Sequence, residues 1–266
     1  MNPLLSVENL RVAFADRRGV RVAVDGTSFT VAPGEVVALV GESGSGKSAT
    51  ALAIMGILPD NARVGPGSAI RFDGNDLLVM PERELRRLRG RRLAMVFQEP
   101  AAALNPVMKV GEQVAEVAIV HGEGDRQVAR ARAVAMLERV GLPDAARLYD
   151  AYPLELSGGM RQRVMIAAAL LLEPALVIAD EPTSSLDVTV QAQVLRLLLE
   201  LQRASGTAVL LITHDLGVVA ETCERAIVMR AGRIVETATV DDLFHAPAHE
   251  YTRELLAAMP RIRKGA

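Results

Sequence analysis

The glycine-rich segment 41–48 constrains the fold of this chain more than any other part of its sequence. It fits the pattern G-x-x-x-x-G-K-[ST] at every fixed position. The apolar run at 36–40 before it is typical of a buried parallel strand, and residues 49–58 after it predict a helix that ends near Pro59. A strand, a glycine loop and a helix in this order predict a phosphate-binding loop, and the alternative is a glycine-rich turn that binds nothing.

The residues of this loop divide into backbone and side-chain roles. The glycines let successive backbone N–H groups curl around phosphate oxygens. The Lys47 ammonium can reach the β- and γ-phosphates, and the Ser48 hydroxyl can bind Mg²⁺. The predicted nucleotide-binding set is Gly41, Glu42, Ser43, Gly44, Ser45, Gly46, Lys47 and Ser48.

Composition and charge exclude several classes of protein. The 266 residues include 30 basic and 32 acidic ones, so the net charge of -2 gives no reason to expect a nucleic-acid partner. The single cysteine, Cys223, excludes an internal disulfide and a four-cysteine metal site within this chain, and we expect it to be a small packed residue. No apolar run approaches the ~20 residues that span a bilayer, and residues 1–14 lack the pattern of a secretory signal. We therefore expect a cytoplasmic protein that another chain holds at any membrane it serves.

The succession of patterns predicts an α/β protein with a mostly parallel, doubly wound sheet. Alternating apolar and polar residues at 4–14, 20–31 and 68–72 predict a small antiparallel sheet near the N-terminus, with a turn at 16–19. Further strands are predicted at 93–97, 176–179 and 207–213, and a hairpin at 225–236. Helical periodicity predicts an inserted helical subdomain within 99–172, a helix at 189–201 and a helical stretch at 240–260. We expect one domain over 1–238, followed by a short helical tail over 239–266.

Residues able to carry chemistry come directly after four of the predicted parallel strands. Ligands of open α/β sheets bind beyond the carboxyl ends of the strands, where neighbouring strands meet at one edge. We therefore expect one catalytic edge that is built from Gly41, Gln98, Asp180, Glu181 and His214.

The side chains of this edge can share the work of hydrolysis. Asp180 is placed to hold Mg²⁺ and Glu181 to act as general base toward water, whereas the alternative is a pair of residues that caps a helix. His214 can hold the water and sense the γ-phosphate, although a lone histidine after a strand is more often a capping or core residue. Gln98 begins an irregular stretch and can act as a neutral metal ligand on a mobile loop.

A second anion site is predicted at the run 156–160. Ser157 occupies the N-cap position of a helix whose apolar body covers 164–172. Gly158 and Gly159 leave the first backbone N–H groups of that helix uncovered, which favours an anion there. The alternative is a well-capped helix after a glycine turn.

Taken together, these motifs resemble the nucleotide-binding subunit of ATP-binding-cassette (ABC) transporters over essentially the full chain. The order of segments 41–48, 98, 156–160, 176–181, 185–187 and 214 carries the resemblance. It implies a P-loop NTPase core of the RecA-like type, ATP hydrolysis with Mg²⁺, and two cassettes packed head to tail around two nucleotides. By this resemblance the signature Ser157, Gly158, Gly159 and Met160 acts on the ATP of the other cassette, Asp187 couples the dimer, and Phe14 stacks on adenine unless it is a core residue.

Two segments narrow the resemblance to the dipeptide, oligopeptide and nickel importer branch. They are 96–108, with the motifs Val-Phe-Gln-Glu-Pro and Leu-Asn-Pro-Val-Met, and the tail at 247–256. Glu250 replaces a proline that is usual in the tail motif, and Met160 replaces the glutamine of most of the superfamily. Peptide-importing members often continue into a cysteine-bearing extension, and this sequence lacks those cysteines. The resemblance therefore implies an ATP-hydrolysing subunit of an importer for peptides or for nickel or metallophore complexes, and the missing cysteines favour the latter without excluding peptides.

The resemblance implies partners and a location at the cytoplasmic face of the inner membrane. We expect a second cassette, either a paralogue or a copy of this chain, two transmembrane permease subunits and an extracytoplasmic solute-binding protein. The alternatives are a peptide exporter and a soluble ABC ATPase that acts on nucleic acid or ribosomes. The arginine-rich run 86–92 is the support for that last class, and we interpret the run as a solvated helix face.

Overall fold

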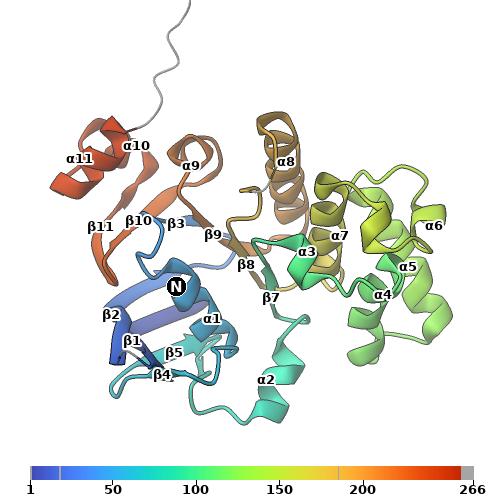
Figure 1. Ribbon diagram of the computed structural model, residues 1–266, viewed down its shortest axis with the longest axis horizontal. Helices are drawn as coiled ribbons and strands as arrows, with labels where there is room; N and C mark the ends of the chain where they lie inside the picture. Colours follow the sequence, from blue (N-terminus) through green and yellow to red (C-terminus); the bar gives the residue numbers. More distant parts are fainter. Residues whose placement is uncertain (1, 18, 185, 259–266) are drawn as a thin grey trace, which may run out of the picture.

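A six-stranded sheet runs through the centre of the molecule (Figure 1). The structure, a computed structural model, describes residues 2–17, 19–184 and 186–258. Five strands pair in parallel in the order β10-β3-β9-β8-β7, and β11 adds an antiparallel edge beside β10. The strands are β3 (Val36–Val40), β7 (Leu93–Val96), β8 (Leu176–Asp180), β9 (Ala208–Thr213), β10 (Arg225–Arg230) and β11 (Arg233–Thr239). The predicted mostly parallel sheet is confirmed.

Alternate residues of the central strands point into different cores. In β3, Val37 and Leu39 belong to a core shared with α1 (Lys47–Met55) and the antiparallel sheet, and Ala38 and Val40 belong to a core on the other face. Because both faces are covered, every residue of β3, β8 and β9 is buried. This explains why these strands are continuous apolar runs in the sequence.

A second, antiparallel sheet lies over α1 and contains the first two strands of the chain. Its strands are β1 (Leu5–Asp16), β2 (Gly19–Val31), β4 (Ala62–Val64), β5 (Ala69–Phe72) and β6 (Asn75–Asp76). They follow the order β2-β1-β5-β6, with β4 paired to β1. The predicted pairing of the first two strands is confirmed, although residue 18 of the predicted turn lies outside the described residues.

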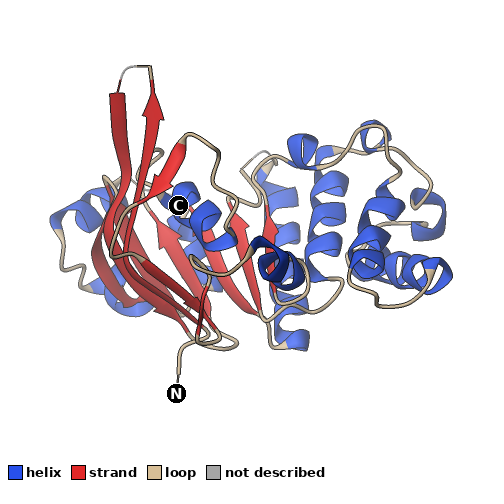
Figure 2. Cartoon of the chain, turned by 90° about the horizontal axis from the view of Figure 1, so that it is seen from below, coloured by secondary structure: helices blue, strands red, loops and turns tan. Residues whose placement is uncertain are grey.

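The segment between β7 and β8 is helical and forms the part of the molecule farthest from the antiparallel sheet (Figure 2). Its helices are α3 (Pro100–Ala103), α4 (Val110–Val120), α5 (Arg126–Arg139), α6 (Ala145–Leu148), the 3-10 turn Pro153–Glu155 and α7 (Gly158–Leu170). Gly111 is required in α4 because an added Cβ would lie 2.1 Å from the ring of Tyr149. Helices α4, α5 and α7 share one hydrophobic core with α8 (Val188–Ser205).

The remaining helices flank the two sheets. They are α2 (Glu82–Leu88), α9 (Leu216–Thr222), α10 (Val240–His245) and α11 (Glu250–Ala257). Figure 1 shows α10 and α11 beside β11 and α9, away from α4 to α6. The predicted helical stretch over 240–260 is interrupted at 246–249, a segment that contains Pro247 and separates α10 from α11. Residues 259–260 lie outside the described residues.

The interpretation of the arginine-rich run 86–92 as a helix face holds only for its first residues. Helix α2 ends at Leu88, and Arg89 turns inward instead. The Arg89 guanidinium donates to the carbonyl oxygens of Met55 (2.8 Å) and Gly56 (2.9 Å), which the end of α1 leaves free. The Arg89 side chain therefore caps the C-terminus of α1.

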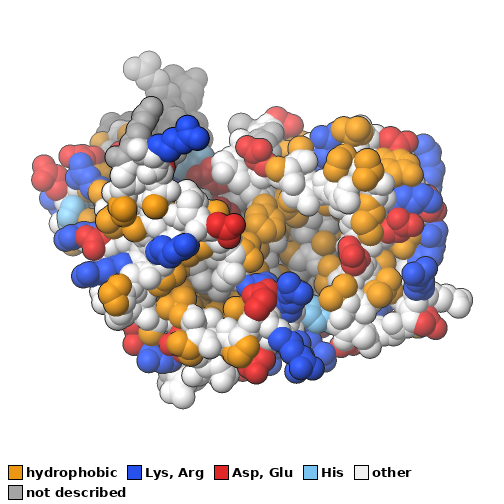
Figure 3. Space-filling model, turned by 60° about the horizontal axis from the view of Figure 1, so that its bottom comes forward, with side chains coloured by type: hydrophobic (Ala, Val, Ile, Leu, Met, Phe, Trp, Pro, Cys, Tyr) orange, Lys and Arg blue, Asp and Glu red, His pale blue; other side chains and the backbone are white. Residues whose placement is uncertain are grey.

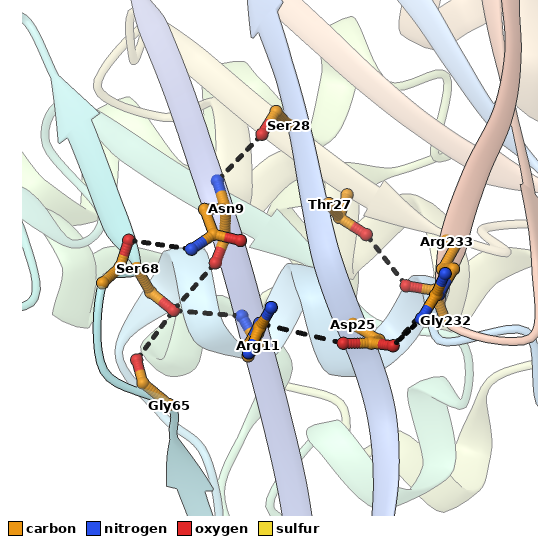
Figure 4. A network of polar contacts seen from close by, with 10 residues as sticks. Asn9, Arg11, Asp25, Thr27, Ser28, Gly65, Ser68, Gly232 and Arg233 are labelled. Carbon is orange, nitrogen blue, oxygen red and sulfur yellow. Dashed lines mark hydrogen bonds and ion pairs between the residues drawn. The ribbon is translucent and has the colours of Figure 1, made fainter.

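A polar network joins the two sheets at the β10–β11 hairpin (Figure 4). The hairpin turn contains Gly232, whose carbonyl oxygen accepts from the Asp25 N–H (2.8 Å) and the Thr27 hydroxyl (3.0 Å). The Arg233 guanidinium lies 2.6 Å from the Asp25 carboxylate, and Arg11 lies on the other side of that carboxylate at 3.8 Å. The network fixes the hairpin against β2.

Among the described residues, no helix combines the length and apolar character that crossing a bilayer requires.

Candidate active site

The loop between β3 and α1 is packed so tightly that two of its positions require glycine. A Cβ added at Gly46 would lie 2.4 Å from the carbonyl oxygen of Ala23 in β2, and one at Gly41 would lie 2.1 Å from that of Met229 in β10. Gly46 also has φ 108°, a conformation that favours glycine. Helix α1 begins at Lys47, so the free N–H groups of its first turn adjoin the loop.

The Lys47 ammonium lies inside this loop. It donates to the carbonyl oxygens of Gly41 (2.7 Å) and Glu42 (2.9 Å), and the side chain is 4 % exposed. Burial lowers the pKa of Lys47, while the carboxylates of Glu181 and Asp180 act in the opposite direction. A cation held this way is set to meet a phosphate group at the mouth of the loop.

Ser48 and Asp180 form an oxygen-rich pair at the start of α1. The Ser48 hydroxyl donates to Asp180 Oδ1 across 3.1 Å. Burial raises the pKa of Asp180, which is 6 % exposed, and the Ser48 hydrogen bond lowers it in part. A hydroxyl and a carboxylate are hard oxygen ligands, the donors that Mg²⁺ prefers, so these residues fit a magnesium ion.

The Glu181 carboxylate lies between Gln98 and His214. Gln98 Nε2 donates to Glu181 Oε2 across 3.2 Å, and His214 Nδ1 lies 3.3 Å from Oε1. Glu181 has φ 43° and its N–H donates to Ile212 in β9, so its side chain leaves the strand in a different direction from that of Asp180. The helix-capping alternative for the two carboxylates was wrong, because Asp187 caps the following helix.

These side chains open onto one pocket of about 870 Å³. Asp180 and Ser45 do not line it, because Asp180 lies behind Ser48 and the Ser45 side chain is 5 % exposed. The predicted residues that line it are Phe14, Gly41, Glu42, Ser43, Gly44, Gly46, Lys47, Ser48, Gln98, Glu181 and His214. The structure thus brings together side chains from the ends of four strands.

Sequence reasoning missed several residues of the pocket wall. Arg21 lies directly opposite Phe14 in the β1–β2 ladder, and both line the pocket. Counting the register back from the tight turn between β1 and β2 would have found Arg21. Leu255 and Ala258 reach the pocket from the tail, a placement for which the sequence has no local signal. Phe14 also packs partly against the core, so its two predicted roles are compatible.

The run 156–160 lies outside this pocket. Ser157 caps α7, and its hydroxyl accepts from the Met160 N–H across 3.3 Å, as the cap prediction required. A Cβ added at Gly159 would lie 2.7 Å from Val190 in α8, so this glycine lets the first turn of α7 approach that helix. Gly158 faces Leu186 with more room, at 3.6 Å.

Asp187 lies beside this run, at the start of α8. Its carboxylate accepts from the Val190 N–H across 3.0 Å and caps the helix. Asp187 is exposed, as Ser157 is, so both side chains are accessible from outside the chain. Ser185, part of the same motif, lies outside the described residues.

Comparisons with known proteins agree with this geometry. The ABC transporter family profile matches residues 24–184, and the profile of the oligopeptide/dipeptide transporter C-terminal region matches residues 235–266. The chain is 52% identical to the oligopeptide transport ATP-binding protein OppD of Haemophilus influenzae, covering 98% of this chain and 80% of that protein. It is 51% identical to the dipeptide transport ATP-binding protein DppD of Escherichia coli, covering 97% and 79%.

Solved structures show the same fold. A dimeric ATP-binding cassette, MJ0796, bound to ADP and Pi in a post-hydrolysis state, has a TM-score of 0.79 and 27% identity, covering 89% of this chain and 98% of that one. CbiO1 from Clostridium perfringens, part of the ABC transporter complex cbiONQ, has a TM-score of 0.76 and 29% identity, covering 98% of both chains. The P-loop fold of ABC cassettes is therefore confirmed, and this chain belongs to the ABC transporter family as an ATP-binding, ATP-hydrolysing subunit.

Proposed function

We propose that this chain hydrolyses ATP to power an importer of peptides. The observation that carries the proposal is the meeting of the phosphate loop, Ser48 with Asp180 hydrogen-bonded behind it, and the Gln98–Glu181–His214 group at one pocket. The tail profile and the relatives named for oligopeptide and dipeptide transport support peptides as the cargo. Import of nickel or a metallophore complex stays a prediction from the sequence.

The residues of the pocket divide into those that bind the nucleotide and those that act on water. The loop N–H groups and the Lys47 ammonium hold the phosphates, and Phe14 offers its ring to the base. Ser48, Asp180 and Gln98 would hold Mg²⁺, which would neutralise phosphate charge. Glu181 lines the same pocket as the phosphate loop, within reach of a nucleotide held there.

Hydrolysis then needs a water molecule and a base. Glu181 accepts the proton of the attacking water while the water oxygen bonds to the γ-phosphorus and the bond to the bridging oxygen of ADP breaks. The amide of Gln98 and the ring of His214 orient the Glu181 carboxylate, since both lie within 3.3 Å of its oxygens. His214 also lines the pocket with its side chain 61 % exposed, so its ring is accessible to the γ-phosphate of a bound nucleotide.

The signature Ser157, Gly158, Gly159 and Met160 completes the site of a second cassette. Its position outside the pocket supports this, because the exposed start of α7 has no phosphate loop of its own chain beside it. Asp187, at the adjacent start of α8, couples the two cassettes. The second cassette is a paralogue or a copy of this chain.

Subunits of this family work with permease subunits and as pairs of cassettes. In our proposal this chain lies at the cytoplasmic face of the inner membrane, against two permease subunits that receive cargo from an extracytoplasmic binding protein. The stretch after Gln98 transmits the closure of the cassette pair to the permeases. Residues 1–238 form the cassette with its helical subdomain at 99–172, and 239–266 form the tail.

Charge supplies no support for a nucleic-acid partner. Within the run 86–92, four arginines pair with carboxylates, at 3.1 Å or less: Arg86 and Arg89 with Glu82, Arg91 with Glu123, and Arg92 with Asp73. On the face shown in Figure 3, basic side chains are interspersed with acidic ones. The run therefore presents little free positive charge to a phosphate backbone.

The proposal is tested by capture and reconstitution. An affinity-tagged chain extracted from membranes should co-purify with two polytopic membrane proteins. In proteoliposomes that contain this complex and its binding protein, peptides should stimulate ATP hydrolysis and a nickel salt should not. Capture of ribosomes or nucleic acid in place of membrane proteins would overturn the proposal of a transporter subunit. Stimulation of ATP hydrolysis by nickel alone would overturn the proposal that peptides are the cargo.

A further inference from the structure

The phosphate loop is held in place by elements from the C-terminal part of the chain. The N–H of Gly232, in the β10–β11 turn, donates to the carbonyl oxygen of Ser45 across 2.9 Å. The backbone of Met229 closes on Gly41 so tightly that a Cβ would not fit. The conformation of the loop therefore depends on the β10–β11 hairpin as well as on β3 and α1.

The tail adds a contact of its own to this loop. The Tyr251 hydroxyl, on α11, accepts a hydrogen bond from the Glu42 N–H across 3.1 Å, and the two residues are 209 positions apart in the sequence. Tyr251 is 1 % exposed, whereas Glu42 lines the nucleotide pocket. A buried side chain of the tail thus reaches the first turn of the loop.

The position of this hydroxyl is fixed from several sides. The Arg230 guanidinium lies over the Tyr251 ring, 4.5 Å from its centroid, and Glu254 lies 4.0 Å from that guanidinium. His249 Nδ1 accepts from the Tyr251 N–H across 3.1 Å and caps α11. The Glu236 carboxylate accepts from the N–H groups of Ala248 (2.8 Å) and His249 (2.9 Å), which ties the start of α11 to β11.

The tail also forms part of the pocket itself. Leu255 lies one helical turn after Tyr251 on the same face of α11, and it lines the pocket together with Ala258. A ligand that fills this part of the pocket therefore contacts the tail directly, and a ligand that moves the phosphate loop affects the tail through the Glu42–Tyr251 hydrogen bond. Both contacts come from the segment that matches the oligopeptide/dipeptide transporter C-terminal region.

We infer that Tyr251 is a positioning residue of the nucleotide site, which holds the phosphate loop in its binding conformation and couples that loop to the tail. The inference rests on the proposed function, because it concerns the same ATP site. Coupling between two sites is reciprocal. If docking of α11 raises the nucleotide affinity by some factor, nucleotide binding must raise the equilibrium constant for docking of α11 by the same factor. Any partner that holds or displaces α11 would change nucleotide affinity through this contact.

The test compares two tyrosines that differ in what their hydroxyls reach. Tyr251→Phe keeps the ring and its Arg230 contact and removes the hydrogen bond to Glu42. Tyr149→Phe is the matched control, because Tyr149 is also buried, with Arg130 over its ring at 3.9 Å, but lies in the helical region. Calorimetric titration of the full chain with ADP and Mg²⁺ should show ADP affinity about fivefold weaker for Tyr251→Phe and unchanged for Tyr149→Phe. A fivefold loss corresponds to the net contribution of one hydrogen bond.

A second measurement separates positioning from a loss of stability. In the wild-type chain, ADP with Mg²⁺ should slow hydrogen exchange of the α11 amides. This nucleotide-dependent protection should be weaker in Tyr251→Phe, which keeps only the direct contact of ligand with Leu255 and Ala258, and should be unchanged in Tyr149→Phe. Equal ADP affinity in the three proteins, or equal protection of α11 in the wild-type chain and Tyr251→Phe, would overturn the inference. A wild-type chain that does not bind ADP with Mg²⁺ would instead overturn the proposed function.

Discussion

The Ser48 hydroxyl and the Asp180 carboxylate lie 3.1 Å apart, although 132 positions separate the two residues in the sequence. Ser48 is in the first turn of α1 and Asp180 is the last residue of β8. The two are neighbours because β3 and β8 flank β9 in one parallel sheet, with their carboxyl ends at one edge. The sheet, more than either local motif, thus creates the magnesium-binding pair.

Glu181→Gln should nearly stop ATP hydrolysis while ATP binding is kept. The amide has the same shape as the carboxylate but cannot accept a proton from water, and such a loss lowers the rate on the order of 10² to 10⁴-fold. Phosphate release and nucleotide titration measure the two properties separately. Glu138→Gln, an exposed change in α5, should leave both unaltered. Full hydrolysis by Glu181→Gln would exclude Glu181 as the base.

Ser157→Arg should abolish cooperative ATP hydrolysis and leave nucleotide binding by the single chain largely unchanged. The reason is that Ser157 lies outside the chain's own pocket and, in our proposal, faces the nucleotide of the partner cassette. The dependence of hydrolysis rate on protein concentration measures the effect.

Ser157→Ala is the matched variant for this experiment. Both substitutions remove the hydrogen bond to Met160 and should cost about 1 kcal/mol of helix capping, but only arginine adds bulk and charge. A collapse of nucleotide binding by monomeric Ser157→Arg would show that the signature serves its own chain.

Gly46→Ala should destabilise the chain and weaken nucleotide binding more than Gly44→Ala. Both glycines have positive φ, at 108° and 80°, so alanine is strained at either position. Only the Cβ at position 46 would meet the Ala23 carbonyl oxygen, at 2.4 Å, whereas nothing lies within 4 Å at position 44. We expect the additional cost at Gly46 to be about 1–3 kcal/mol in thermal or urea unfolding. Equal losses in the free energy of unfolding for the two variants would show that the loop adjusts to a Cβ at position 46 without further cost.

Cys223 should react slowly with thiol reagents in the folded chain. Burial raises the pKa of this thiol to about 11 from a usual value of 9.0, which lowers the thiolate fraction at pH 8 roughly 100-fold. The rate of alkylation against pH should therefore rise with a midpoint near 11 in the native chain and near 9 in the chain unfolded by urea.

The same shift predicts a small pH dependence of stability. The unfolded chain loses the thiol proton at a lower pH than the folded chain, so the free energy of unfolding should fall as pH rises from about 9 to about 11. Cys223→Ala should remove that part of the slope. A native alkylation midpoint near 9 would contradict both statements.

Local patterns predicted much of the fold. The burial of β3, β8 and β9 on both faces is recorded in the sequence as apolar runs, and the predicted cap at Ser157 involves residues only three positions apart. The tail break at 246–249 and the inward turn of Arg89 were missed. The first depends on a single proline within a periodic pattern, and the second on a contact with the end of α1, which is distant in the sequence.

The replacement of proline by Glu250 in the tail has a simple structural account. Glu250 is the first residue of α11, after the cap His249. Proline is tolerated at this position because no N–H partner is needed there, and a carboxylate is favourable there because it faces the positive end of the helix dipole. The departure from the motif therefore leaves the helix intact.

The sequence alone determined the phosphate loop, the order of the longer strands and helices, and the side chains at the strand ends, because each depends on neighbouring residues and on a regular period. Only the tertiary structure decided that Leu255 and Ala258 of the tail line the pocket, that the hairpin turn at Gly232 holds the phosphate loop, and that Tyr251 reaches Glu42. Tyr251 and Glu42 illustrate the physical reason. A hydrogen bond between residues 209 positions apart depends on how two packed elements meet, and neither local sequence records it.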